Sequence, residues 1–95
     1  MSFLRPTSEE KIITAVVTDR RRRTEISKRI HWLTREQFSF VKSTDDGWSR
    51  LYWDAHDGRY WELTYPHSEM HGGGPAQIEE VTPEYASLRY GVTSQ

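Results

Sequence analysis

Two histidines in this chain have the spacing of a metal-ligand pair. His67 and His71 are four residues apart with Glu69 between them. On a helix this spacing would place both imidazoles on one face, where they could bind zinc. A helix is not expected here, because Pro66 precedes the pair and the glycines at 72–74 follow it. We therefore expect a loop that holds neither a metal nor another cofactor.

The same loop contains the residue types of two other sites. Ser68, Glu69 and His71 are the types of a hydrolytic triad, but their crowding within four positions disfavours the required geometry. The glycine triplet could cradle a phosphate, but such a loop needs a following Lys and Ser/Thr at a helix start, whereas Pro75 follows here and has no N–H. The sequence therefore predicts a protein that is not an enzyme. A small metal-dependent hydrolase is the second alternative.

Charge is divided unevenly along the chain. Residues 1–35 hold nine Lys/Arg against four Asp/Glu, whereas residues 36–95 hold four against ten. The run Arg20–Arg23 is predicted to be a solvated connection, because four adjacent cations repel one another and cannot be buried together. Such a run can bind phosphates, so a small nucleic-acid-binding module is the first alternative function. The net charge of −1 and the lack of interleaved aromatic residues disfavour it.

Length and composition predict one domain over residues 1–95. The chain has no cysteine, which excludes disulfides and thiolate metal sites. It has no apolar stretch long enough for a signal peptide or a membrane span. We therefore expect a domain in a reducing bacterial cytoplasm that makes no membrane contact, held together by a core in which aromatic residues, 13% of the chain, take a large part.

One helix is well marked by its hydrophobic spacing. Ile26, Ile30 and Leu33 recur at four and three residues and form one apolar stripe. Thr24 can cap this helix at its start, so the predicted span is 24–35. The stripe requires an apolar sheet face to pack against.

The remaining pattern completes an α+β fold with a small antiparallel sheet of four to five strands. Thr7 and Glu10 have capping-box spacing, which predicts a helical turn near the start of the chain. Thr82-Pro83 opens a short C-terminal helix that stops at Gly91. The expected strands cover residues 12–18, 37–43, 48–54, 59–65 and, as an optional fifth strand, 77–81.

The hairpin between the third and fourth strands has a register that can be derived. Placing Leu51 and Trp53 on the same face as Trp61 and Leu63 requires a loop of odd length, and His56-Asp57-Gly58 supplies three residues with Gly58 at positive φ. Trp53 is then opposite Trp61, and Leu51 is opposite Leu63. This face is predicted to receive the helix.

The other face of the hairpin is predicted to be the wetter one, with Tyr52 opposite Glu62. The loop 67–75 is expected to fold back over the sheet, with Glu69 or His71 hydrogen-bonded to its backbone.

The block DGRYWELTYP followed by HSEMHGGGP resembles the signature of the immunity protein 27 family of bacterial polymorphic toxin systems. The helix Arg29–Leu33 and the segment from Asp46-Gly47-Trp48 to Leu51-Tyr52 resemble the family pattern too, so that the resemblance covers about residues 24–90. It implies a cytoplasmic antitoxin that is encoded beside its toxin and blocks it by tight binding without catalysis.

The resemblance implies a cognate toxin domain as partner, and many such toxins act on nucleic acid and present basic active sites. An acidic and aromatic surface in the second half of the chain would complement such a site. Tyrosine rings exposed there would supply packed anchors. The predicted contact residues are Asp45, Asp46, Tyr52, Asp54, Asp57, Tyr60, Glu62, Glu69 and His71.

Overall fold

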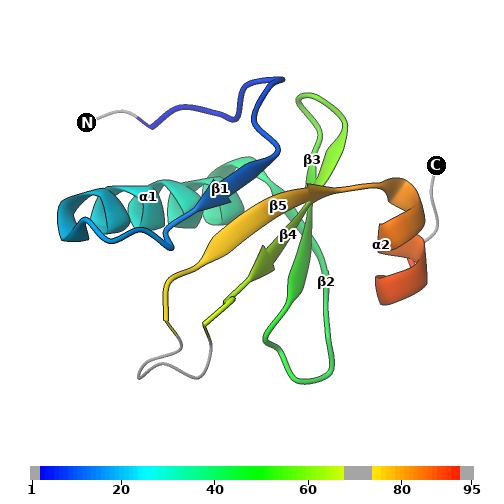
Figure 1. The fold of residues 1–95 in the computed structure, drawn as a ribbon. Coiled ribbons are helices and arrows are strands. Elements are labelled where there is room, and N and C mark those ends of the chain that lie inside the picture. The colour runs from blue at the N-terminus through cyan, green and yellow to red at the C-terminus, as the bar shows by residue number, and fades with distance from the viewer. Residues whose placement is uncertain (1–2, 68–73, 93–95) are drawn as a thin grey trace.

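The computed structural model describes residues 3–67 and 74–92. In chain order the elements are β1 (Ile12–Thr14), α1 (Arg20–Trp32), the π-helical turn η1 (Leu33–Gln37), β2 (Ser39–Ser43), β3 (Arg50–Asp54), β4 (Arg59–Thr64), β5 (Gln77–Val81) and α2 (Pro83–Tyr90). The strands form one antiparallel sheet in the order β1-β5-β4-β3-β2 (Figure 1). The predicted α+β class is confirmed. Within the described ranges, no helix is long and apolar enough to cross a membrane.

α1 begins four residues earlier than the sequence pattern predicts, because Asp19 rather than Thr24 caps it. The Asp19 carboxylate accepts hydrogen bonds from the backbone N–H groups of Arg21 at 2.9 Å and Arg22 at 3.3 Å. The arginine run 20–23 is therefore the first turn of the helix and not a connection. Asp and Thr are both strong capping residues, so the sequence pattern alone does not decide which of the two begins the helix.

β1 covers only three of the seven residues expected for the first strand. The chain leaves the sheet after Thr14, whose hydroxyl accepts a hydrogen bond from the Val16 N–H at 3.0 Å. Before β1, Thr7 and Glu10 exchange the reciprocal hydrogen bonds of a capping box, at 2.9 and 3.2 Å. The Glu10 N–H also donates to the Thr7 carbonyl at 3.1 Å, so a single hydrogen-bonded turn forms where a turn was expected, and the chain then enters β1.

The hairpin of β3 and β4 is shifted by one residue from the predicted register. Trp53 is opposite Tyr60 and Leu51 is opposite Glu62, because the loop has four residues, 55–58. The Gly58 N–H donates to the Asp54 carbonyl at 2.8 Å, and Gly58 has the expected positive φ, at 71°. Since side chains alternate across a sheet, this shift puts Leu51 and Trp61 on opposite faces.

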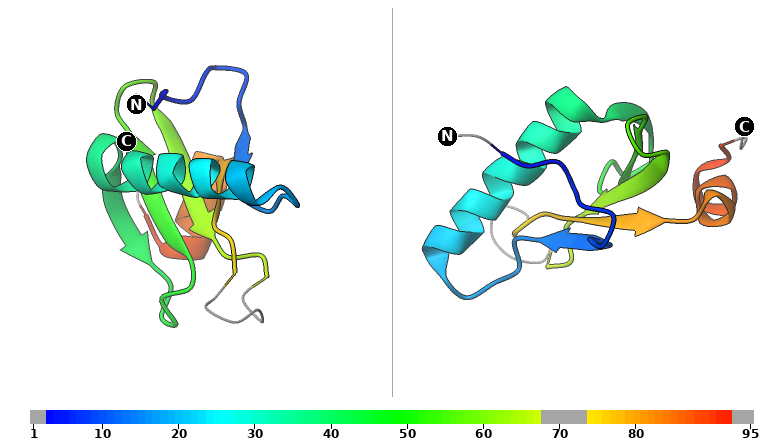
Figure 2. Two further views of the ribbon diagram at one scale, coloured as in Figure 1. Left: turned by 90° about the vertical axis from the view of Figure 1, so that its left-hand side faces the viewer. Right: turned by 90° about the horizontal axis from the view of Figure 1, so that it is seen from above.

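Both faces of the sheet are consequently covered. Ile30 of α1 and Leu33 of η1 pack with Tyr52, Trp61 and other residues in one buried cluster. On the other face, Leu51 of β3 packs with Ala86 and Tyr90 of α2 in a smaller buried cluster. Figure 2 shows α1 in front of the strands and α2 behind them. Tyr52 and Glu62, predicted to share a wet face, therefore lie on opposite faces, and both are buried.

α2 confirms the signals read from its sequence. The Thr82 hydroxyl accepts a hydrogen bond from the Tyr85 N–H at 3.0 Å, and Pro83 is in the first turn. Gly91 ends the helix at φ 70°, in the left-handed region. Only Thr82 separates β5 from α2, so the end of β5 fixes where α2 begins beside the sheet.

Candidate partner-binding surface

Asp54, a predicted contact residue, is buried with only 1% of its surface exposed. Its Oδ1 accepts hydrogen bonds from the Arg5 guanidinium and from the backbone N–H of His56, the latter at 3.0 Å. Arg5 also donates to Gln37 Oε1 at 2.5 Å. We call residues 3–11 the N-terminal segment. Through Arg5, this segment is joined to the β3–β4 hairpin at Asp54 and to η1 at Gln37. Asp54 thus holds the fold together and offers no carboxylate to a partner.

Glu62 is also buried, at 6% exposure. Its carboxylate accepts hydrogen bonds from Tyr85 Oη at 3.0 Å, from Arg89 Nε at 2.9 Å and from Tyr90 Oη at 2.6 Å. Burial raises the pKa of Tyr90, and its hydrogen bond to the carboxylate raises that pKa further. Glu62 follows Trp61 on β4 and therefore lies on the opposite face of the sheet, and it is buried because α2 covers that face.

The two predicted tyrosine anchors are engaged in packing. Tyr52 is buried at 5% exposure, so the expectation that it presents an exposed ring is wrong. It lies on the α1 face in register with Trp61. Tyr60 is half-buried and packs against Trp53 with ring centroids 4.8 Å apart. Tyr60 therefore keeps part of its ring accessible, whereas Tyr52 does not.

Asp57 is exposed at the tip of the β3–β4 hairpin, but it is not an independent charge. Arg59 pairs with it at 2.6 Å, and although burial opposes the shift, the hydrogen bond from Arg59 lowers the pKa of Asp57. Arg59 also donates to the carbonyls of Thr7 and Glu10, at 3.0 and 2.8 Å, and to Glu80 at 3.2 Å. One guanidinium thus links the hairpin, β5 and the N-terminal segment.

Asp45 and Asp46 are exposed in the β2–β3 turn, as predicted. Asp46 accepts hydrogen bonds from the Thr44 hydroxyl at 2.6 Å and from the Trp48 N–H at 2.9 Å, and these bonds lower its pKa. Glu69 and His71 lie outside the described residues. The predicted acidic surface is therefore reduced, within the described ranges, to this turn and the hairpin tip.

Arg29 of α1 contacts the N-terminal segment at Leu4, Arg5 and Glu10. It donates to the Leu4 and Arg5 carbonyls at 2.9 and 3.3 Å and pairs with Glu10 at 2.9 Å. The hydrogen bond from Arg29 lowers the pKa of Glu10 below its ordinary value of 4.5. A lowered folded-state pKa means that the carboxylate stabilises the fold above the unfolded-state pKa and that this stability is lost as the pH falls through the folded-state pKa.

We therefore expect Glu10→Gln to lower the free energy of unfolding at neutral pH by up to about 1 kcal/mol, and to match the wild type at acid pH. Urea titrations at a series of pH values below neutral measure this difference. Glu9→Gln, a change at an exposed neighbour, serves as control and should leave the pH profile unchanged. Parallel profiles for wild type and Glu10→Gln would contradict the assignment.

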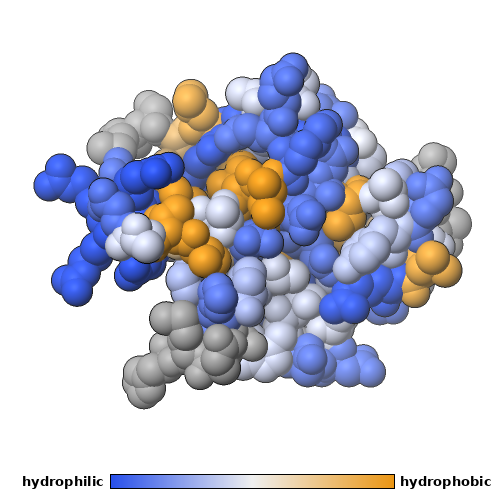
Figure 3. All heavy atoms as spheres, viewed as in Figure 1, coloured by the Kyte–Doolittle hydropathy of each residue, from blue (hydrophilic) through white to orange (hydrophobic). Residues whose placement is uncertain are grey.

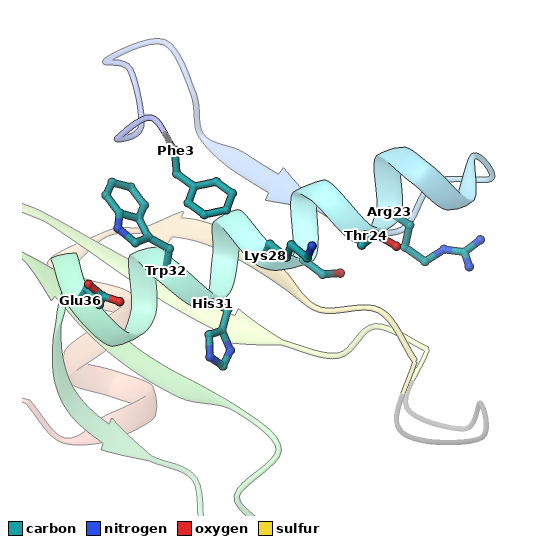
Figure 4. A pocket seen from close by; sticks show the side chains of 8 residues that line it. Phe3, Arg23, Thr24, Lys28, His31, Trp32 and Glu36 are labelled. Atoms are coloured by element: carbon teal, nitrogen blue, oxygen red, sulfur yellow. The ribbon is translucent and has the colours of Figure 1, made fainter. Parts of the chain in front are cut away.

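A second surface, not among the predicted contact residues, lies on the exposed side of α1. Two adjoining hollows of about 600 and 890 Å³ share Phe3, Thr24 and Lys28 in their walls. The Phe3 ring, which comes from the start of the chain, lies on the same side of the helix as the Trp32 ring, with the ring centroids 5.8 Å apart (Figure 4). Strongly hydrophilic side chains extend from the molecule where α1 begins (Figure 3). We call this surface the α1 groove, lined by Phe3, Arg20, Arg21, Thr24, Lys28 and Trp32.

A helical pattern in the sequence could have found most of this groove. Arg20, Thr24, Lys28 and Trp32 recur every four residues, on the side of the helix opposite to the Ile26 stripe. The pattern was missed because the helix was predicted to begin at residue 24, which leaves the arginines outside it. Phe3 carries no comparable signal, since its contact with Trp32 joins distant parts of the chain.

Within residues 3–67 and 74–92, no group of three or more His, Cys, Asp or Glu side chains could hold a metal ion. The His67 and His71 pair is only partly covered by this finding, because His71 lies outside those residues. Comparison with protein-family models gives a match to Immunity protein 27 over residues 18–82. Searches of curated proteins and of solved structures gave no match. The family match spans the elements from α1 to β5.

Proposed function

Because the chain belongs to the immunity protein 27 family, we propose that it neutralises a cognate bacterial toxin by tight, stoichiometric binding without catalysis. The observation that carries this proposal is the family match over residues 18–82. The toxin is proposed to be encoded beside this protein and to be bound in the cytoplasm of the cell that makes both. Binding in this mode requires a surface whose shape is set before the toxin arrives.

The ion pairs of the N-terminal segment support such a preorganised surface. Arg5, Arg29 and Arg59 each join that segment to a different element, through Asp54, through Glu10 and through the Thr7 and Glu10 carbonyls. A surface fixed in this way loses less conformational entropy on binding than a mobile one. Affinity can then come from a modest set of contacts.

The test is titration of the neighbouring toxin with this protein. We expect toxin activity to fall linearly with added protein and to reach zero at one equivalent, and co-expression should protect growth. Toxin recovered from the denatured complex should have its original mass and regain activity, because inhibition by binding alters no covalent bond. Cell death despite soluble, folded protein, with no complex recovered, would refute the proposal.

The acidic β2–β3 turn is a proposed part of the contact. Asp45→Lys should slow association several-fold at low salt and less at high salt, because exposed charges act mainly by steering the encounter. Glu9→Lys makes the same charge change on the N-terminal turn and is the control. Association rates measured by stopped flow at two salt concentrations decide the point. Equal rates for the two variants would remove the turn from the interface.

A further inference from the structure

The basic side chains of this chain fall into two groups. Arg5, Lys11, Arg29, Arg59 and Arg89 each form an ion pair with a carboxylate of the fold. In the part of the chain that the structure describes, no ion pair involves any of the arginines 20–23 or Lys28. Within the described residues Arg35, Lys42 and Arg50 have no ion-pair partner either, but the arginines 20–23 and Lys28 lie together along α1, where Arg29 alone of the helix cations is paired.

Helix electrostatics give no reason for the position of this charge. The first turn of α1 contains arginines and no acidic residue. The N-terminal end of a helix carries a partial positive charge, so cations placed there are unfavourable. Arg23 donates to the Val17 carbonyl at 3.2 Å, but within the described residues the side chains of Arg20, Arg21 and Arg22 have no hydrogen-bond or ion-pair partner, and none of the four stabilises the helix end. A role toward another molecule accounts for both observations.

The shape of the α1 groove is a second observation that points to a binding site. Phe3 and Trp32 form an apolar wall beside the two hollows, and Arg20, Arg21 and Lys28 stand along the same side of α1. Concave sites that combine a desolvated aromatic anchor with charged rims are typical of protein interfaces. Hollows of 600 and 890 Å³ are large enough to receive side chains of a bound segment.

We propose that the α1 groove binds an acidic segment of the cognate toxin. An apolar side chain of that segment packs against Phe3 and Trp32, while its carboxylates pair with Arg20, Arg21 and Lys28. This inference rests on the proposed function, and it adds a basic contact surface to the acidic turn. Charge complementarity sets the chemistry of the occupant, because α1 presents cations that the fold does not neutralise.

A polypeptide fits the groove better than a nucleic acid does. Glu36 lines the hollow beside Trp32, and Glu25 lines the hollow beside Arg20. Both carboxylates would face the phosphates of a nucleic acid and repel them, whereas a polypeptide can place an N–H group or a hydroxyl against each. The net charge of −1 for the whole chain also opposes binding to a polyanion.

The experiment compares two double variants with the same change in charge. Arg21→Glu with Lys28→Glu reverses the groove, and Lys42→Glu with Arg50→Glu reverses two exposed cations elsewhere. Binding of the inactivated toxin domain is followed at about 50 and about 300 mM salt. We expect the groove variant to lose about tenfold or more in association rate at low salt, and the control to lose less than about threefold. Phe3→Ala should raise the dissociation rate with little effect on association.

Folding is checked by melting temperature, which should not fall in the groove variant, because Arg21→Glu removes a cation from the positive end of the helix. A neutral variant, Arg21→Gln with Lys28→Gln, covers the case in which charge reversal harms folding. If wild type and groove variants bind the toxin equally, this inference is wrong and the proposed function stands. If the wild-type protein binds no toxin, both are wrong.

The nucleic-acid alternative is decided in the same series. Duplex DNA and single-stranded RNA of about 20 nucleotides are offered as probes, since a phosphate-binding face would show salt-dependent affinity for them. If the wild type binds either nucleic acid tightly and the groove variant does not, the assignment of the groove to a protein segment is wrong. If all variants bind the nucleic acids equally weakly, that assignment is supported.

Discussion

Replacing Trp61 by alanine should lower the free energy of unfolding by about 3–5 kcal/mol, as expected for truncating a fully buried large aromatic residue. The side chain is 0% exposed and stacks on Phe38, with centroids 6.0 Å apart and planes 10° apart. The guanidinium of Arg59 lies 4.8 Å above the Trp61 ring. Truncation therefore removes the stacking on Phe38. It also removes the ring that packs against Arg59, whose guanidinium binds the Thr7 and Glu10 carbonyls.

Urea denaturation followed by circular dichroism measures the change, and Trp48→Ala provides the control. Trp48 is 49% exposed and touches Tyr65 edge-on at 5.7 Å, so its truncation should cost about 1 kcal/mol or less. Trp61→Phe should lie between the two. It loses no hydrogen bond, because the indole N–H of Trp61 has no acceptor among the described residues. Equal midpoints for Trp61→Ala and wild type would refute the assigned core.

The sequence pattern predicts Trp61 as a core residue correctly, but it does not determine which residues share its face. A three-residue loop and a four-residue loop can both close with Gly58 at positive φ, so the turn chemistry does not distinguish them. The alternation of Leu51 and Trp53 favoured the first loop because it assumes one apolar face. The hairpin is apolar on both faces, since Leu51 lies under α2 and Tyr52 under α1.

Long-range ion pairs account for the burial of two predicted contact residues, Asp54 and Glu62. Arg5 pairs with Asp54 and Arg89 with Glu62, over separations of 49 and 27 residues. No local spacing rule reports a partner so far along the chain. A sequence can show that a carboxylate is present, but the fold decides whether a guanidinium already holds it. The exposed pair Asp45-Asp46 was placed correctly because a tight turn with Gly47 is itself a local feature.

The family was identified correctly from the sequence, although the hairpin register was not. The block from Gly58 to Pro75 combines a hairpin glycine, a strand and a glycine-rich sequence, and such a combination is far more specific than any one hydrophobic period. The matched range 18–82 includes it. The match leaves out Phe3 and Arg5, so the N-terminal contacts with α1 and the hairpin emerge only from the structure.

Glu62→Ala should lower the free energy of unfolding by about 3 kcal/mol, because it removes the acceptor of three side-chain donors between the sheet and α2. Arg89 and Tyr85 can turn to water, whereas Tyr90 is only 3% exposed and would be left with an unpaired hydroxyl. Thermal and urea denaturation measure the loss. Glu79→Ala is the control, because Glu79 is exposed and directly opposite Glu62 in the sheet. Its removal should be neutral or slightly stabilising, since like charges repel there.

A double-mutant cycle with Tyr90→Phe separates the orphaned hydroxyl from the other losses. In that background Glu62→Ala should cost about 1 kcal/mol less, because no buried donor is left without an acceptor. The pH dependence gives an independent test. The pKa of Tyr90 is raised in the folded protein, so its contribution is present below the ordinary value of 10.0 and is lost as the pH rises through the folded-state pKa. Tyr90→Phe should therefore flatten the alkaline limb of the stability profile. Additive losses in the cycle, together with an unchanged alkaline limb, would mean that Glu62 and Tyr90 do not act as a pair.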